Sequence, residues 1–361
     1  MGLSVDKKIE LIKSFAEEII NEEELRELFR TKKEIIAYDG FEPSGQIHIA
    51  QGLLRTLTVN KLTSCGVKFK FWVADWFGML NNKLGGDLNK IHIVGEYFIE
   101  VWKACGLDMK NVEFIWASDF IKKNPEYWET VLKLSMNSTI NRVMRCGQIM
   151  GREESTNNPS AQILYPLMQA ADIHHLKADI AQLGLDQRKV NMLARDIFPK
   201  LGLKPPIAVH HHMLLGLQHK NTEGMNSIDK KIELKMSKSK PETAIFMTDT
   251  KEDVFRKFKK AYCPEKEEKD NPILEYAKYI VFEKYKSIII KRPAKYGGNL
   301  EIKSYDKLKE LFIAGKIHPL DLKDTIARYV DELLQPVREH FKKNKKAKEL
   351  LKKIQSFEVS R

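Results

Sequence analysis

The sequence lacks the features of a membrane-spanning or disulfide-stabilised chain. None of its apolar runs is long enough to cross a bilayer, and its first residues, MGLSVDKKIE, do not form an apolar leader. Only four cysteines occur among 361 residues, far apart and without the C-x-x-C pair typical of a zinc site. We therefore expect a cytoplasmic protein in a reducing compartment, with no membrane partner and no metal centre of its own.

Acidic residues are comparatively scarce in the last third of the chain. The net charge is +12, and residues 255–361 contain 27 Lys and Arg but only 16 Asp and Glu, so this third carries nearly the whole surplus. Together with Tyr and His side chains, such a surplus is typical of a surface that binds nucleic-acid phosphates. For the lysine-rich stretch 341–353 we favour the alternative, a solvated basic tail.

Predicted strands alternate with predicted helices through the first 250 residues. After an amphipathic helix over residues 5–29, strands are predicted over 33–40, 67–75, 112–118, 178–183 and 206–211, and helices over 48–64, 89–105, 186–198 and a long stretch ending near 175. This alternation predicts a parallel sheet with helices on both faces. From about residue 251 the pattern is mostly helical, with the loop KRPAKYGGN between helices, so we place a domain boundary near residue 250.

Polar residues lie where the predicted strands end. Tyr38 and Gly40 close the first strand, Asp75 the second, and Asp186 and Gln187 follow the fourth. Because ligands of parallel sheets bind at the carboxyl ends of the strands, we expect these residues to meet in one crevice.

Two loop motifs fit phosphate chemistry. In FEPSGQIHIAQ (41–51), His48 follows a turn that opens a helix, where an imidazole donor and helix amides favour negative charge. In LKMSKSKPETAIF (234–246), lysines alternate with serines in a loop that could close over a polyphosphate. Taken singly, a solvated histidine and a solvated lysine-rich loop are the alternatives.

A polar stripe crosses an otherwise apolar helix. Tyr165, Gln169 and Asp172 are spaced by four and three residues, so they share one face, and Gln187 at the next strand end is expected to point into the same crevice. Buried polar groups need partners, which a bound amino acid or neighbouring protein groups would supply.

These stretches, in this order, resemble the tyrosyl-tRNA synthetases of the archaeal and eukaryotic type from about residue 8 to 341. YDGFEPSGQIHIAQ looks like that family's HIGH signature, KMSKS (235–239) like its second signature, 165–195 like its tyrosine pocket, and IKRPAKYGGNL with IHPLDLK like its anticodon-binding domain. The resemblance implies an α/β fold: a Rossmann-like parallel-sheet catalytic domain (1–250) with an insertion at about 105–160 for the homodimer interface and acceptor stem, followed by a mostly α-helical anticodon-binding domain (251–361) with a basic tail.

The resemblance also implies an activity and roles for particular residues. The protein would activate L-tyrosine with ATP and Mg²⁺ and transfer it from tyrosyl-adenylate to the terminal ribose of tRNA(Tyr). The catalytic positions are His48, Gln51, Lys235 and Lys238. The tyrosine positions are Tyr38, Ala74, Tyr165, Gln169, Asp172 and Gln187, of which Tyr38 and Asp172 match the pair that reads the phenol. The ATP positions are Gly40, Glu42, Ser44, His48, Gln51, Lys235, Met236, Ser237 and Lys238, and the anticodon positions are Tyr296, His318 and Asp321.

The sequence departs from the HIGH signature at two positions. Ala50 stands where glycine is usual, and Gln51 stands where a second histidine is usual. A tryptophanyl-tRNA synthetase is the nearest alternative, but an indole has a single donor and would not satisfy both Tyr38 and Asp172. A catalytically idle tRNA-binding paralogue is the other alternative; the unaltered KMSKS disfavours it, whereas Gln51 leaves it open. The run HHH (210–212) is not interpreted as a metal site.

Overall fold

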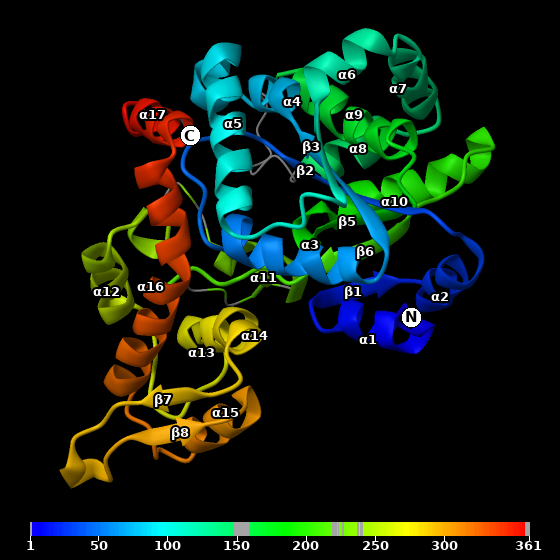
Figure 1. Ribbon diagram of the computed structural model, residues 1–361. Coiled ribbons are helices and arrows are strands. Elements are labelled where there is room, and N and C mark those ends of the chain that lie inside the picture. Colours follow the sequence, from blue (N-terminus) through cyan, green and yellow to red (C-terminus); the bar gives the residue numbers. More distant parts are fainter. Residues whose placement is uncertain are drawn as a thin grey trace.

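A six-stranded sheet forms the centre of the larger part of the molecule (Figure 1). The computed structural model describes residues 2–147, 159–218, 222, 224–225, 227–236, 238 and 241–357, with the backbone alone at 227–229, 231 and 296. The strand order is β1-β6-β5-β2-β3-β4. The strands are β1 Ala16–Ile20, β2 Ile35–Phe41, β3 Val67–Val73, β4 Val112–Trp116, β5 Ile180–Gly184 and β6 Ile207–His211. All pairs are parallel except β1 with β6, so the predicted α/β class is confirmed.

Helices cover both faces of the sheet because its strands are apolar on both sides. Phe69 and Phe71 on β3 belong to one apolar cluster with residues of α3 (Arg55–Ser64) and α5 (Leu88–Ala104). Trp72 of the same strand belongs to a second cluster with residues of α9 (Ala161–His175) and α10 (Arg188–Ile197). Alternate side chains of one strand thus point to opposite helical layers, as expected for a buried parallel sheet.

The single helix predicted over residues 5–29 is wrong. The structure has α1 (Val5–Lys13), then β1, then α2 (Glu22–Thr31). Asn21 divides them: its backbone is left-handed, with φ 64°, and its side chain accepts from the amide of Glu24 at 3.2 Å, which caps α2. The apolar residues at helical spacing belong to two short helices and to a strand that pairs with β6.

The predicted helical stretch after β4 consists of separate helices. α6 (Ala117–Lys123), α7 (Glu126–Met136) and α8 (Ile140–Cys146) precede α9, and residues 148–158 of the predicted insertion lie outside the described part of the chain. Shorter elements complete this part of the molecule: the π-helical turn η1 Ala50–Leu54, α4 Asp75–Leu80, η2 Lys83–Gly86, η4 Leu185–Gln187, η5 Phe198–Leu201, α11 Ser227–Leu234 and η6 Pro241–Thr243.

The C-terminal part is mostly helical, as predicted, but contains a small hairpin. Strands β7 (Ile288–Ile290) and β8 (Leu300–Ile302) pair antiparallel. The segment KRPAKYGGN therefore connects two strands and not two helices, because the β-branched run at Ile288–Ile290 buries alternate residues. The remaining elements are α12 Lys251–Lys260, α13 Pro272–Tyr276, η7 Ala277–Val281, α14 Phe282–Lys284, η8 Ala294–Tyr296, α15 Tyr305–Ile313, α16 Pro319–Lys343 and α17 Lys345–Gln355.

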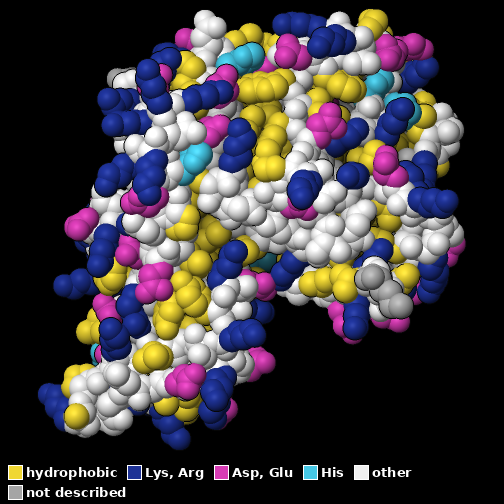
Figure 2. All heavy atoms as spheres, viewed as in Figure 1, with side chains coloured by type: hydrophobic (Ala, Val, Ile, Leu, Met, Phe, Trp, Pro, Cys, Tyr) yellow, Lys and Arg dark blue, Asp and Glu magenta, His cyan; other side chains and the backbone are white. Residues whose placement is uncertain are grey.

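The lysine-rich stretch 341–353 is not a free tail. Within it α17 begins, and its Ala347, Leu350 and Ile354 are buried in the contact with α5, beside an ion pair of Lys346 with Glu96 at 3.0 Å. The expectation of a solvated tail is wrong because apolar residues recur at helical spacing between the lysines. Figure 2 shows the Lys and Arg side chains of this region on the outside, at the upper left. Within the described ranges we find no helix with the length and apolar character of a membrane span.

Candidate active site

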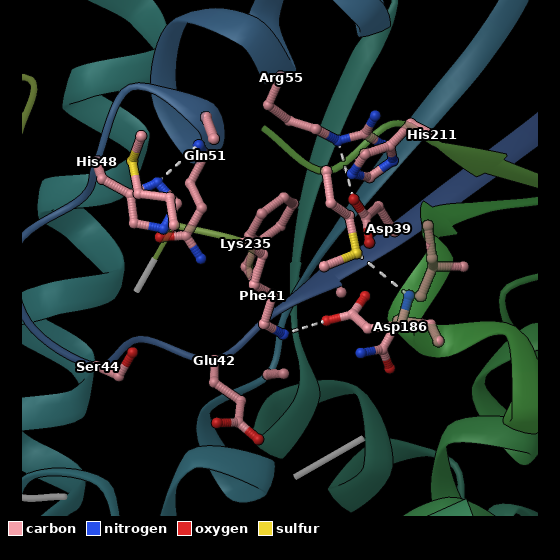
Figure 3. A pocket seen from close by; sticks show the side chains of 18 of the residues that line it. Asp39, Phe41, Glu42, Ser44, His48, Gln51, Arg55, Asp186, His211 and Lys235 are labelled. Atoms are coloured by element: carbon pink, nitrogen blue, oxygen red, sulfur yellow. Dashed lines mark hydrogen bonds and ion pairs between the residues drawn. The ribbon is translucent and has the colours of Figure 1, made fainter. Parts of the chain in front are cut away.

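A cleft of about 1000 Å³ opens where β2, β5 and β6 end. It is lined by every described residue that the sequence assigned to catalysis, tyrosine or ATP, whereas Ser237 lies outside the described residues. Figure 3 shows His48 and Gln51 on one side, Asp39, Arg55 and His211 on the other, and Lys235 between them. Asp75 does not line the cleft: it is fully buried and accepts from Ser118 Oγ at 2.5 Å, so its expected place in the crevice is wrong.

His48 lies just before η1, buried at the wall of the cleft. Burial, together with the nearby charges of Lys238 and Lys235, holds the pKa of His48 well below its usual range, so the imidazole is neutral at physiological pH. Its Nδ1 accepts from the backbone N–H of Gln51 at 3.3 Å. A neutral imidazole that accepts at Nδ1 carries its proton on Nε2, and this N–H is the donor available to a ligand.

The two described lysines of KMSKS are held differently. Lys235 forms an ion pair with Asp186 Oδ2 at 2.7 Å. Lys238 donates to Ser44 Oγ at 3.2 Å, and its ammonium lies 4.5 Å from the centre of the Phe98 ring. Burial, reinforced by the neighbouring charge of Lys83, lowers the pKa of Lys238 to about 7, so its charge is easily lost unless an anion binds.

A buried hydroxyl and a buried carboxylate meet at the floor of the cleft. The Tyr38 hydroxyl is buried and has no hydrogen-bond partner among the described residues. Asp172 Oδ1 lies 2.7 Å from the Tyr127 hydroxyl, and burial raises the pKa of Asp172 well above its usual range despite that hydrogen bond. A buried hydroxyl without a hydrogen-bond partner is energetically unfavourable. A hydroxyl group of a ligand could form the missing hydrogen bond and also bind the carboxylate.

The polar stripe of α9 continues toward the cleft entrance. Gln169 Nε2 donates to Gln187 Oε1 at 3.0 Å. The Tyr165 hydroxyl donates to Glu42, which also accepts from Asn81 Nδ2 at 3.1 Å. The side-chain amides of Gln169 and Gln187 and the carboxylate of Glu42 all line the cleft, and such oxygen atoms are suited to accept from an ammonium group.

Comparisons with known proteins agree with this geometry. The family model of class I tRNA synthetases (W and Y) matches residues 30–335. The chain belongs to this family. It is 48% identical to the cytoplasmic tyrosine–tRNA ligase 1 of Arabidopsis thaliana, over 100% of this chain and 91% of the relative. The tyrosyl-tRNA synthetase of Pyrococcus horikoshii complexed with L-tyrosine superposes with a TM-score of 0.89 at 37% identity, over 97% of this chain and 100% of that chain. The Leishmania major enzyme in complex with tyrosinol matches with a TM-score of 0.89 at 43% identity over 99% of this chain, which spans about half, 53%, of that longer chain.

Three residues of this synthetase, at the cleft or next to it, were not predicted from the sequence: Asp39 and Arg55 line the cleft, and Tyr127 contacts the cleft residue Asp172. Tyr127 comes from α7, where no motif marks it, and only its place on the buried face of the helix could have drawn attention. Asp39 and Arg55 form a buried pair, with 2.8 Å between Oδ2 and Nε, and Arg55 also donates to the carbonyl of Gln182 at 3.0 Å. Burial raises the pKa of Asp39 to about 7, although the Arg55 guanidinium opposes the shift.

The histidines at 210–212 of the synthetase are bound by protein groups. His210 contacts Glu18 Oε2 at 2.8 Å and Asn191 at 3.0 Å. His212 contacts Glu17 Oε2 at 2.9 Å and Glu275 Oε2 at 3.1 Å. Across the part of the chain that the structure describes, no group of three or more His, Cys, Asp or Glu side chains could hold a metal ion.

The three predicted anticodon positions lie in two segments of the C-terminal part, the start of α16 and the connection between β7 and β8, whose strands Figure 1 labels. His318 caps α16 by accepting from the amide of Leu320 at 3.2 Å, and Asp321 follows in the first turn. Tyr296 ends η8, in the connection between β7 and β8. Arg292 ties the two segments together, since it donates to the carbonyls of Gly298 at 3.1 Å and Lys316 at 2.9 Å.

Proposed function

We propose that the protein is a tyrosine–tRNA ligase, which activates L-tyrosine with ATP and transfers it to the terminal ribose of tRNA(Tyr). Tyrosine is proposed as the amino acid because Tyr38 and Asp172 both line the cleft. A phenol donates to the carboxylate and accepts from the free hydroxyl, whereas phenylalanine offers neither group and tryptophan only a donor. The Arabidopsis relative carries this activity in its name.

The proposed chemistry is attack of the tyrosine carboxylate on the α-phosphate of ATP, with pyrophosphate leaving. His48 Nε2–H stabilises the negative charge that grows on the phosphate. Lys235 and Lys238 neutralise the departing pyrophosphate, for which Lys235 must leave Asp186. Gln51 assists as a neutral side chain, and its Oε1 is buried and lacks a partner among the described residues.

The remaining cleft residues are proposed to position the two substrates. Gln169, Gln187 and Tyr165 would hold the ammonium group of tyrosine, and Ala74 would lie against its ring. The nucleotide would be bordered by Gly40, Glu42, Ser44 and Met236. Ser237 lies outside the described residues, so its role in ATP binding is proposed from the sequence alone. Magnesium would arrive with ATP and be held chiefly by phosphate oxygens, because the described residues offer no ready set of metal ligands.

For tRNA, we propose that residues 1–250 form the catalytic domain and residues 251–361 the anticodon-binding domain. Tyr296 would stack on the first anticodon base, and Asp321 would accept from it near His318. Two observations support this proposal. Arg292 joins the two segments that carry these residues, and residues 255–361 contain many more Lys and Arg than Asp and Glu.

We further propose a homodimer that meets through α7 and its surroundings. Its exposed side chains form an apolar stripe at helical spacing, with Trp128 39%, Leu132 63% and Met136 83% exposed, and Ile140 at the start of α8 is 68% exposed. A stripe of this kind is typical of a surface that is covered by a partner. The name of the Arabidopsis relative supports a cytoplasmic location.

The experiment that tests the proposed function is exchange of pyrophosphate into ATP that depends on a particular amino acid. Tyrosine should support exchange, and phenylalanine and tryptophan should not. A catalytically idle paralogue would bind tRNA(Tyr) without exchange.

A further inference from the structure

The segment that carries Lys235 is fastened to the segment that follows β6. Leu215 and Lys235 form an antiparallel β-bridge. On either side, Gly216 N–H donates to the carbonyl of Leu234 at 2.9 Å, and Met236 N–H donates to that of Leu214 at 3.0 Å. A shift of residues 214–216 would therefore carry the Lys235 backbone with it.

One carboxylate of the C-terminal part holds that same segment. Glu275, on α13, accepts from the backbone N–H of Leu215 at 3.0 Å through Oε2. The same oxygen contacts His212 Nε2 at 3.1 Å, while His212 Nδ1 contacts Glu17 of β1 at 2.9 Å. The imidazole also stacks on Tyr279 of η7, with 4.2 Å between ring centres. His212 thus joins the edge of the sheet to α13 and lines the active-site cleft.

A second contact lies five residues earlier in the C-terminal part. Asp270 forms an ion pair with Lys230 of α11 at 2.5 Å, and α11 runs directly into Lys235. Between these contacts lies a cavity of about 220 Å³, lined by Leu185, Leu215, Leu234 and the charged groups just named.

From these contacts we infer that Glu275 is a positioning residue: through Leu215 and His212 it sets where Lys235 lies for adenylate formation. The C-terminal part would thereby control the catalytic lysine without touching substrate. The inference rests on the proposed function, because it concerns the step in which Lys235 acts.

Charged groups surround His212, so its contacts depend on whether the imidazole is protonated. It is faced by Glu17 from β1, by Glu275 from α13, by the Lys230–Asp270 pair across the cavity, and by Tyr279, over whose ring Lys278 lies. Burial alone would lower the pKa of His212, but the hydrogen bonds to the two carboxylates raise it to about 9. The imidazolium is therefore present at neutral pH, where it can donate to both carboxylates.

The test compares two Glu275 variants with a matched control. Glu275→Ala should slow single-turnover adenylate formation by about 10- to 100-fold, as for a misplaced catalytic group, with tyrosine affinity within about twofold of wild type. Glu275→Gln keeps an oxygen for Leu215 and His212, so it should retain most of the rate near pH 7. The substitution also removes one negative charge beside His212, so the pKa of His212 should drop below about 9. The ratio of the variant's rate to the wild-type rate should therefore begin to fall at a pH below 9.

The control is His340→Ala, which removes another histidine–carboxylate contact between the two parts, with Glu100 at 2.8 Å, that does not reach Lys235. Its adenylate rate should equal that of wild type. Unchanged rates in Glu275→Ala, an equal loss in His340→Ala, or a pH-independent ratio for Glu275→Gln would each overturn the inference. Absence of tyrosine-dependent exchange in the wild type would instead overturn the proposed function.

Discussion

Lys235 lies 2.7 Å from Asp186 in an ion pair, so one of the proposed pyrophosphate ligands is held by a carboxylate at the end of β5. The pair is partly exposed, with 35% and 19% of the two side-chain surfaces accessible, so solvent screening keeps its contribution to stability small. In the proposed mechanism, the pair would keep the lysine near the pyrophosphate site and would break when the more highly charged pyrophosphate forms.

The first prediction follows from this release. Lys235→Ala should slow adenylate formation by about 100-fold or more, and Lys238→Ala should do the same, because the charges act mainly on the leaving pyrophosphate. Tyrosine binding without ATP, measured by calorimetry, should stay nearly unchanged. A parallel loss of tyrosine affinity would show that these lysines shape the amino acid pocket instead.

The second prediction concerns protons taken up on nucleotide binding. Lys238 has a pKa of about 7, so above that pH it is mostly neutral, and phosphates that favour the charged form raise its pKa. ATP binding near pH 8 should therefore take up protons, which calorimetry in buffers of different ionisation enthalpy would detect. Lys238→Met should bind ATP with less uptake. Equal uptake in both proteins would assign the proton to another group.

The third prediction ranks the two polar residues of the first signature. His48→Ala should cost about 3 kcal/mol in adenylate formation, as for a lost oxyanion donor, and Gln51→Ala about 1 kcal/mol, as for a neutral hydrogen bond. Since the pKa of His48 lies well below its usual range, its contribution should not titrate between pH 6.5 and 8. Single-turnover rates for both variants decide the order, and a larger loss for Gln51→Ala would reverse it.

The fourth prediction tests the apolar stripe of α7. Leu132→Asp should convert a dimer to monomers, because it places a charge in the proposed contact. The control, Leu320→Asp, alters a leucine of similar exposure, 57% against 63%, at the start of α16 and should leave the dimer intact. Light scattering after gel filtration measures both, and a wild-type monomer would contradict the proposed interface.

Much of the catalytic part could be predicted because its motifs are local. The strand ends, the histidine before η1 and the stripe on α9 are each set by residues close in sequence, and the structure gathers them, apart from Asp75, in one cleft. Contacts made at long range could not be predicted: Tyr127 reaches Asp172 across 45 positions, and Glu275 reaches His212 across 63. At the N-terminus, local periodicity misled, because β1 becomes a strand only by pairing with β6.

Amino-acid-dependent exchange of pyrophosphate into ATP tests the central claim most directly. Tyr38 and Asp172 should favour tyrosine over phenylalanine in kcat/KM, because phenylalanine leaves both groups without a hydrogen-bond partner. The expected ratio is about 10⁴- to 10⁵-fold, which is the ratio known for tyrosyl-tRNA synthetases. Tryptophan should support no measurable exchange. Comparable rates with tyrosine and phenylalanine, or faster exchange with tryptophan, would contradict the assignment of the cleft floor as a phenol site.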